Sequence, residues 1–120
     1  MFEPLDFLQV ALDLAERSNR TEAHIRTAIG RSYYAVHLKA LWGLERRGLF
    51  EPNADASDHG RVISTLRLHR RNEAADELRR LRRLRDIADY RINVEIVPAD
   101  WLSAKESAEK LVFLLTTDWT

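Results

Sequence analysis

The sequence predicts an all-α protein that folds as a single domain over residues 1–120. Only 4 glycines and 3 prolines interrupt the chain, whereas 45% of its residues are hydrophobic and 32% are charged. This balance is typical of a compact helical protein rather than of a disordered or all-β chain. Apolar residues also recur at helical spacing, and residues that favour helix ends stand between the apolar stretches. We therefore expect a helical bundle with short loops.

Two helices are expected in the first 47 residues. Asn19 and Glu22 match an N-x-x-E capping box, which predicts a long helix over residues 20–47 that Gly48 ends. The preceding helix, of about 14 residues, ends before Ser18 and is indicated by its apolar spacing. Its apolar residues are Leu5, Leu8, Val10, Ala11, Leu12, Leu14 and Ala15.

The long second helix has two faces that are apolar or only weakly polar. Because both faces need a cover, this helix is expected to lie at the centre of a bundle or to be shared with a second subunit. Tyr33 and Tyr34 can stack on bases, but aromatic residues at helical spacing are usually core residues. One face consists of Ile25, Ala28, Ile29, Ser32, Val36 and Ala40, and the other of Tyr34, Leu38, Leu41 and Trp42.

A loop and three further helices are expected after residue 50. Each helix begins at a side chain that can accept hydrogen bonds from free backbone N–H groups, or at a proline whose fixed φ suits the first turn. The expected elements are a loop over residues 51–58, a third helix capped by Ser57 or Asp58 and ending near Arg70, a fourth helix capped by Asn72 and reaching about Asn93, a short extended segment over residues 94–97, and a fifth helix that Pro98 opens.

Positive and negative charges cancel over the whole chain but are segregated along it. Residues 61–91 hold ten arginines against five acidic residues, whereas residues 1–24 and 95–120 each hold five acidic against two basic residues. Sixteen of the 19 basic residues are arginines, whose planar guanidinium groups bind phosphate through paired hydrogen bonds. This pattern is compatible with RNA or nucleotide binding, and equally with a solvated face of paired charges.

Several classes of site are disfavoured. The chain has no cysteine, so it can form no disulfide or thiolate zinc site, and this is compatible with a reducing cytosol. His24, His37 and His69 lack the spacing of a metal-binding motif, so we expect neither a metal nor a cofactor. The first residues lack the profile of a secretory signal, and the apolar run over residues 111–115 is too short to span a bilayer. A cytoplasmic protein without a membrane partner is expected.

The most informative cluster is Arg-Asp-Ile-Ala-Asp-Tyr at residues 85–90. Arg85 and Asp89 fall within or beside an apolar arc of the fourth helix, where an isolated charge is costly to desolvate. Two accounts remain open: an intrahelical pair between residues four apart, or a cleft that binds phosphate. The arc consists of Leu78, Leu81, Leu84, Ala88 and Ile92.

Three segments resemble the HEPN domain, a small helical bundle found across prokaryotes and in larger eukaryotic proteins. Residues 29–37, Ile-Gly-Arg-Ser-Tyr-Tyr-Ala-Val-His, resemble the R-x-Y-Y-A segment of its central helices. Residues 58–63 are similar to the H-[GK]-x-V-I stretch of one branch, and residues 85–90 match the R-x-x-A-D-Y ending of that branch's fourth helix. In order and spacing, the resemblance covers roughly residues 5–115.

The resemblance implies an antiparallel four-helix bundle core with an additional C-terminal helix, commonly dimeric. In active members, R-x-x-x-x-H motifs of two subunits face each other and form a metal-independent endoribonuclease centre. Tyr90 occupies the histidine position counted from Arg85, and an unperturbed phenol with a pKa near 10 is a poor base at pH 7. The resemblance therefore implies a protein of a prokaryotic toxin–antitoxin or defence system that binds RNA or a nucleotide in a homodimer cleft, with weak or lost endoribonuclease activity.

The candidate catalytic residues are Arg85, Asp89 and Tyr90. Arg85 is expected to contact phosphate, Asp89 to orient Arg85, and Tyr90 to supply a hydrogen bond or act as a weak acid. The alternative function is a catalytically inert adaptor that binds a partner nucleotidyltransferase, the antitoxin of such a pair, and uses Arg85 and Asp89 only for packing.

Arg31, His59 and Arg82 are the candidate RNA- or nucleotide-binding residues. His59 follows a predicted helix start, where free N–H groups attract anions, although a polar residue in a first turn needs no function. Arg31 can point toward a ligand or form a buried pair with Asp89.

Overall fold

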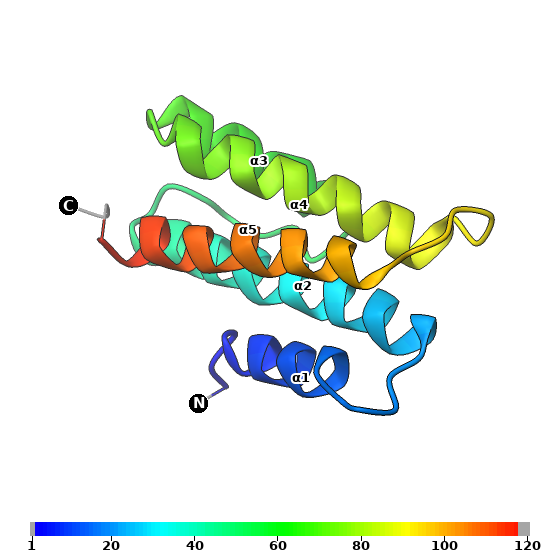
Figure 1. The fold of residues 1–120 in the computed structure, drawn as a ribbon. Coiled ribbons are helices and arrows are strands. Elements are labelled where there is room, and N and C mark those ends of the chain that lie inside the picture. Colours follow the sequence, from blue (N-terminus) through cyan, green and yellow to red (C-terminus); the bar gives the residue numbers. More distant parts are fainter. Residues whose placement is uncertain (1, 118–120) are drawn as a thin grey trace.

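The computed structural model describes residues 2–117, which fold into five α-helices (Figure 1). No β-strand occurs in that range, so the all-α prediction is confirmed, and residues 94–97 form an irregular connection rather than an extended strand. None of these helices combines the length and the apolar character that crossing a membrane requires. The helices are α1 (Asp6–Ala15), α2 (Glu22–Arg46), α3 (Ser57–Leu68), α4 (Asn72–Tyr90) and α5 (Pro98–Thr117).

Helix α2 lies at the centre of the molecule, as its two water-avoiding faces predict. It packs against α1 on one side and against α4 and α5 on the other, while α3 packs mainly against α4 (Figure 1). The chain colours in Figure 1 show that α4 runs opposite to α2 and α5. The segment between α2 and α3 turns back along α2 before α3 begins, and this return places the start of α3 beside the middle of α2.

The core joins side chains from all five helices. Helix α5 packs against both α2 and α4, so it belongs to the core and is not an addition to it. The peripheral helix is instead α1, which buries Ala11 and Ala15 against α2. Burying large apolar side chains supplies most of the stabilisation of such a fold. The largest fully buried apolar side chains include Tyr33, Ile29, Leu44, Leu66, Leu78, Leu81, Leu111 and Leu115.

The predicted start of α2 is wrong, whereas its predicted end at Gly48 is confirmed. Thr21, not Asn19, is the N-cap, and the His24 Nδ1 atom accepts the Thr21 backbone N–H at 3.0 Å in the place of the expected Glu22 carboxylate. The expected box fails because the chain becomes helical two residues later. Gly48, by contrast, ends the helix at φ +70°, a left-handed conformation that glycine adopts without a Cβ clash.

The starts of α3 and α4 also differ from the predictions. Ser57 and Asn72 are the first helical residues, and the preceding Ala56 and Arg71 occupy the N-cap positions without side-chain capping bonds. Asp58 lies inside the first turn of α3 and binds the loop before it. Pro98 does open α5, because its missing N–H would have no partner in a first turn.

A side chain from α2 holds the end of α4. Helices leave their last carbonyl groups without intrahelical donors, and here the Arg26 guanidinium supplies those donors from α2. This arginine anchor, defined by Arg26 and the carbonyls it contacts, ends α4 at Tyr90 rather than at Asn93. Arg26 donates to the carbonyls of Ile87 (3.2 Å), Ala88 (2.9 Å), Arg91 (3.2 Å) and Val94, and its Nε donates to the Glu22 carboxylate at 2.8 Å.

Candidate functional site

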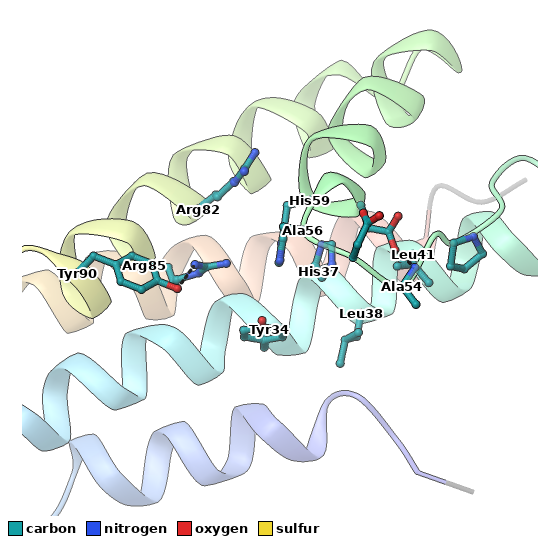
Figure 2. Close-up of a pocket in the computed structure, with 13 residues that line it drawn as sticks. Tyr34, His37, Leu38, Leu41, Ala54, Ala56, His59, Arg82, Arg85 and Tyr90 are labelled. Atoms are coloured by element: carbon teal, nitrogen blue, oxygen red, sulfur yellow. Dashed lines mark hydrogen bonds between the residues drawn. The ribbon is translucent and has the colours of Figure 1, made fainter.

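A pocket of about 600 Å³ opens between α2, the start of α3 and the second half of α4 (Figure 2). This volume falls within the range of small-molecule sites. Arg82, Arg85, His59 and Tyr90, all expected as functional residues, lie on its wall. The remaining lining residues are Tyr34, His37, Leu38, Leu41, Pro52, Ala54, Asp55, Ala56 and Asp58.

Arg85 is buried at the inner wall of this pocket, with 6% of its surface exposed. Its guanidinium carbon lies 4.9 Å from the ring centroid of Tyr33, 5.6 Å from that of Tyr34 and 5.8 Å from that of Tyr90. Such cation–π contacts replace part of the hydration that burial removes. The helical spacing of α4 thus correctly predicts that this charge is sheltered.

The polar contacts of Arg85 are incomplete. Its Nη1 atom lies 3.2 Å from an Asp86 carboxylate oxygen and 3.5 Å from the Tyr90 hydroxyl, whereas its Nε atom is 4.0 Å from the nearer Asp89 oxygen. Within residues 2–117, the buried Nε atom has no hydrogen-bond partner. The predicted pair with Asp89 is therefore long, and the guanidinium keeps donor capacity for a ligand.

Asp89 lies against α2 at Gly30. A Cβ atom at Gly30 would come within 3.0 Å of an Asp89 carboxylate oxygen, so the glycine makes room for this acidic side chain. Burial raises the pKa of the Asp89 carboxyl, while the nearby positive charges of Arg85 and Arg31 act in the opposite direction. Asp89 does not line the pocket, and its nearer oxygen lies 4.0 Å from Arg85 Nε.

Arg31 also lies outside the pocket lining. Its guanidinium carbon is 5.3 Å from the ring centroid of Phe7 and 5.1 Å from that of Tyr34, so it stacks between α1 and α2. Of the three binding residues expected from the sequence, the structure brings His59 and Arg82 to the pocket and leaves Arg31 beside α1.

His37, Tyr33 and His59 form a cluster at the inner side of the pocket that the sequence did not indicate. The rings of His37 and His59 are stacked with centroids 4.3 Å apart, and the Tyr33 hydroxyl lies 2.6 Å from His59 Nδ1. His37 is 3% exposed, and its Nδ1 has no hydrogen-bond partner in residues 2–117. The one local signal was the four-residue spacing of Tyr33 and His37 on a helix, which stacks their rings at 5.5 Å.

Burial keeps this cluster uncharged at neutral pH. It raises the pKa of Tyr33 to about 12 and lowers that of His37 to about 4, with His59 lowering the latter further. The pKa of His59 is also lowered, first by burial and then by the positive charges of Arg85 and Arg82. Burial and, at His59, the neighbouring positive charges disfavour the charged forms of these rings.

The Tyr33 contact fixes the tautomer of His59. The buried Tyr33 hydroxyl has one hydrogen-bond partner in the described chain, His59 Nδ1, and a buried hydroxyl needs an acceptor for its proton. We therefore assign the phenol as the donor, which places the proton of neutral His59 on Nε2. His59 then offers an N–H donor, not a base, to a ligand.

Arg82 and Tyr90 complete the positive end of the pocket. Arg82 lies one turn before Arg85 on the same helix and makes no ion pair within residues 2–117. Tyr90 stands at the rim and is 71% exposed, with its hydroxyl directed at Arg85 Nη1 (Figure 2).

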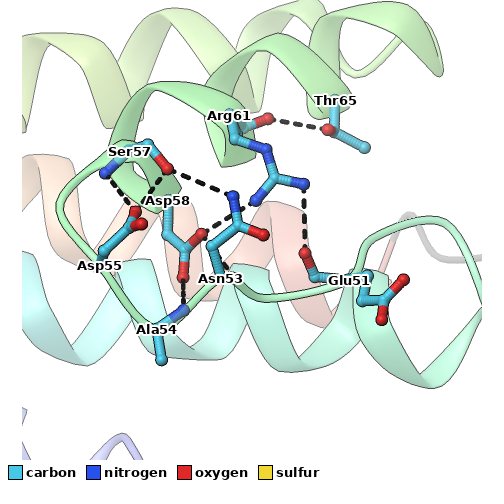
Figure 3. Close-up of polar contacts among 8 residues, drawn as sticks. All are labelled: Glu51, Asn53, Ala54, Asp55, Ser57, Asp58, Arg61 and Thr65. Carbon is cyan, nitrogen blue, oxygen red and sulfur yellow. Dashed lines mark hydrogen bonds and ion pairs between the residues drawn. The ribbon is translucent and has the colours of Figure 1, made fainter.

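Asp58 fixes the opposite wall of the pocket (Figure 3). Its two carboxylate oxygens accept the backbone N–H groups of Asn53 and Ala54, each at 3.0 Å, and Arg61 donates to it at 2.9 Å. The Asn53 N–H in particular lowers the pKa of the Asp58 carboxyl. These bonds hold Ala54 in a left-handed conformation at φ 58°, so Asp58 shapes the loop rather than serving a ligand.

Comparison with known proteins identifies no relative of this chain. No protein-family model matches the chain, and no curated protein or solved structure does either. Within residues 2–117, no three His, Cys, Asp or Glu side chains are grouped so that they could hold a metal ion. The described site is thus a pocket whose arginine, histidine and tyrosine side chains lie beside apolar and acidic ones.

Proposed function

We propose that this chain is a HEPN-type protein that binds RNA or a nucleotide through a phosphate held at Arg85 and Arg82. One observation carries the proposal. The three segments that resemble the family, separated by at least 20 residues in each case, supply side chains to the same pocket. Residues 29–37 supply Tyr34 and His37, residues 58–63 supply His59, and residues 85–90 supply Arg85 and Tyr90.

The chemistry of the pocket favours an anionic ligand. Arg85 is largely desolvated and its Nη2 makes no hydrogen bond within residues 2–117, so a phosphate oxygen can gain a charge-assisted hydrogen bond without displacing a strong internal partner. Arg82 adds a second guanidinium without an ion pair in the described chain, and neutral His59 adds an N–H donor. Three donors of this kind on one wall suit a phosphate better than a carboxylate, because phosphate offers more acceptor oxygens.

The same geometry supports binding more strongly than RNA cleavage. Metal-independent cleavage needs a base for the 2′-hydroxyl proton. Tyr90 is a phenol, and the accessible nitrogen of His59 is its protonated Nε2. His37 is buried beneath His59. We therefore propose a binding protein of a toxin–antitoxin or defence system with weak or no endoribonuclease activity.

The proposal includes α2, α3, α4 and α5 as a four-helix core, and a homodimer with the pocket rim at the interface. The expected antiparallel order holds for α4 against α2 and α5, but α2 and α5 run in the same direction. Apolar side chains exposed next to the rim support this placement, since such groups gain from a partner surface. Tyr90 is 71% exposed and Ile92 is 92% exposed.

The absence of a suitable base also favours a second candidate, a catalytically inert adaptor for a nucleotidyltransferase partner. In that case Arg85 serves packing alone, and the pocket has no phosphate to bind. The two candidates therefore differ in what the loss of the Arg85 charge does to ligand affinity.

The test is the affinity of the full chain for labelled single-stranded RNA of mixed sequence in EDTA, measured by fluorescence anisotropy with a gel assay for cleavage. We expect Arg85→Met to weaken binding about 100-fold, the equivalent of one or two charge-assisted hydrogen bonds. Arg83→Met, the same substitution at an exposed arginine of α4, is the matched control and should change affinity less than about 3-fold. Wild-type affinity in a folded Arg85→Met variant would refute the proposal and favour the adaptor.

A further inference from the structure

We infer that the pocket holds a single nucleotide in one orientation, with its phosphate between Arg85 and Arg82 and its nucleoside against Leu38, Leu41 and Pro52. This inference rests on the proposed function and specifies its ligand. It follows from the uneven distribution of charged and apolar groups along the pocket.

The end of the pocket beside α4 is positive. Arg82, Arg85 and Tyr90 line this end of the pocket. In Figure 2 the Tyr90 hydroxyl lies beside the Arg85 guanidinium, and Arg82 extends from the preceding turn of α4 toward α3. Arg85 contributes most, because its side chain is buried among aromatic rings and its Nη2 makes no hydrogen bond within residues 2–117. An anionic oxygen in the pocket can therefore accept a charge-assisted hydrogen bond from Arg85 Nη2.

The other end is apolar and carries no positive charge. Leu38 and Leu41 come from α2, and Pro52 and Ala54 come from the loop before α3. Figure 2 places Leu38, Leu41 and Ala54 together, on the far side of His37 from Arg85. An inorganic anion at the positive end would leave this surface uncovered, whereas a flat base bound against it would bury apolar area on both partners.

A carboxylate at the apolar end opposes the reverse orientation. Asp55, which follows Ala54 in the chain, lines the pocket, and one of its oxygens accepts the backbone N–H of Ser57 at 2.9 Å. Its other oxygen makes no hydrogen bond within residues 2–117, so it can accept a ribose hydroxyl or a base amino group. The Asp55 charge also repels phosphate, which directs the phosphate to the arginine end.

The dimensions agree with one nucleotide. From Tyr34 to Leu41 the pocket follows seven residues of α2, about 10 Å at 1.5 Å per residue. His37 lies midway, and its ring stacks on His59. A nucleotide in an extended conformation can therefore place its phosphate at Arg85 and its base at Leu41 within one pocket of about 600 Å³.

The experiment measures dissociation constants of the full chain for inorganic phosphate, adenosine and adenosine 5′-monophosphate by calorimetry at pH 7. We expect the nucleotide to bind at least about 10-fold more tightly than phosphate or adenosine alone, because one site receives both parts. Equal affinity for nucleotide and phosphate would overturn the inference.

Variants assign each part of the ligand to its end. Leu41→Ala should weaken nucleotide binding about 5-fold through lost apolar contact and leave phosphate binding unchanged. Asp55→Asn keeps the bond to Ser57 and should lower the ratio of nucleotide to phosphate affinity, which gives a second test on an exposed loop if Leu41→Ala reduces folding. Leu102→Ala, at an exposed leucine of α5, is the matched control and should change neither affinity.

Arg85→Met separates failure of the inference from failure of the proposed function. If phosphate binds through Arg85 but the Leu41 and Asp55 variants change both affinities equally, the orientation is wrong and the phosphate site stands. If no phosphate ligand binds and Arg85→Met has no effect, both proposals fail.

Discussion

Arg26 and Arg85 occupy opposite situations at the same end of the molecule. Arg26 reaches from α2 to α4 and donates to four backbone carbonyls and to the Glu22 carboxylate. Arg85 belongs to α4, is more deeply buried, and has an Nε atom with no partner within residues 2–117. Arg26 thus uses its hydrogen-bond donors to stabilise the fold, whereas Arg85 lines a pocket and has hydrogen-bond donors that no group of the described residues accepts.

The difference shows how a structural arginine can be told from a binding one in a single chain. A fully bonded guanidinium is costly to remove, because each carbonyl it served loses a charge-assisted partner. A buried guanidinium with an unused donor can still bind a ligand, so its removal should weaken ligand binding in addition to any effect on the fold. Arg26 is therefore expected to matter mainly for folding stability, and the pocket around Arg85 mainly for ligand binding.

Acid should destabilise the protein through the pocket and not through the Arg26 anchor. Burial lowers the pKa of His37 from 6.5 to about 4 in the folded state. As pH falls from 6.5 to 4, unfolded chains take up a proton at His37 while folded chains do not, so stability falls, by at most about 3 kcal/mol. Below pH 4 both states are protonated, and this contribution to the loss levels off.

Urea unfolding between pH 7 and pH 4 measures that loss. His37→Phe keeps an aromatic ring on His59 and should lose markedly less stability over this range than the wild type. His69→Phe, at an exposed histidine, is the control and should follow the wild-type curve. If the free energy of unfolding falls equally in His37→Phe and in the wild type, His37 is not the source of the acid destabilisation.

Arg26→Met should lower the free energy of unfolding by about 2 kcal/mol, since several carbonyl groups at the end of α4 lose their donor. The change should appear in chemical denaturation at pH 7, and hydrogen exchange should locate it in the last turn of α4. Arg20→Met provides a control, because Arg20 makes one hydrogen bond, to the Ala15 carbonyl at 3.1 Å. A stability loss no larger than that of the control would count against the anchor.

Tyr33→Phe should have the smallest effect, on the His59 tautomer. Without the phenol proton, Nδ1 of His59 is no longer held as an acceptor, so the Nε2 proton is less strongly fixed. We expect a mixed tautomer in ¹⁵N NMR spectra and phosphate binding weaker by about 3-fold, less than one full hydrogen bond. Tyr34→Phe removes a neighbouring hydroxyl and should leave the tautomer as it is in the wild type.

Local signals in the sequence predicted much of the fold. The apolar periodicity gave five helices, Gly48 gave the end of α2, and Pro98 gave the start of α5. The end of α4 was placed too late because Arg26, more than 60 residues away in the chain, sets it. The cap of α2 was misplaced because a histidine nitrogen at His24 serves where a carboxylate was expected.

The site was predicted only in part, because some of its contacts follow from local spacing and others join residues far apart in the sequence. Arg85 was expected to be buried because helical spacing alone places it in the apolar arc of α4. The Tyr33 contact with His59 joins residues 26 apart in sequence, and no local pattern announces it. Arg31 was a candidate ligand-binding residue with a buried pair to Asp89 as the alternative, but its stacking on Phe7 of α1 depends on how two helices pack.

The most direct test of the contrast is the dissociation constant for adenosine 5′-monophosphate of Arg85→Met and Arg26→Met, measured under conditions where both variants are folded. We expect about a 100-fold weaker complex for Arg85→Met and a change of less than about 2-fold for Arg26→Met. Equal affinities in the two variants would contradict the account, because the donors that Arg85 holds in reserve would then serve no ligand.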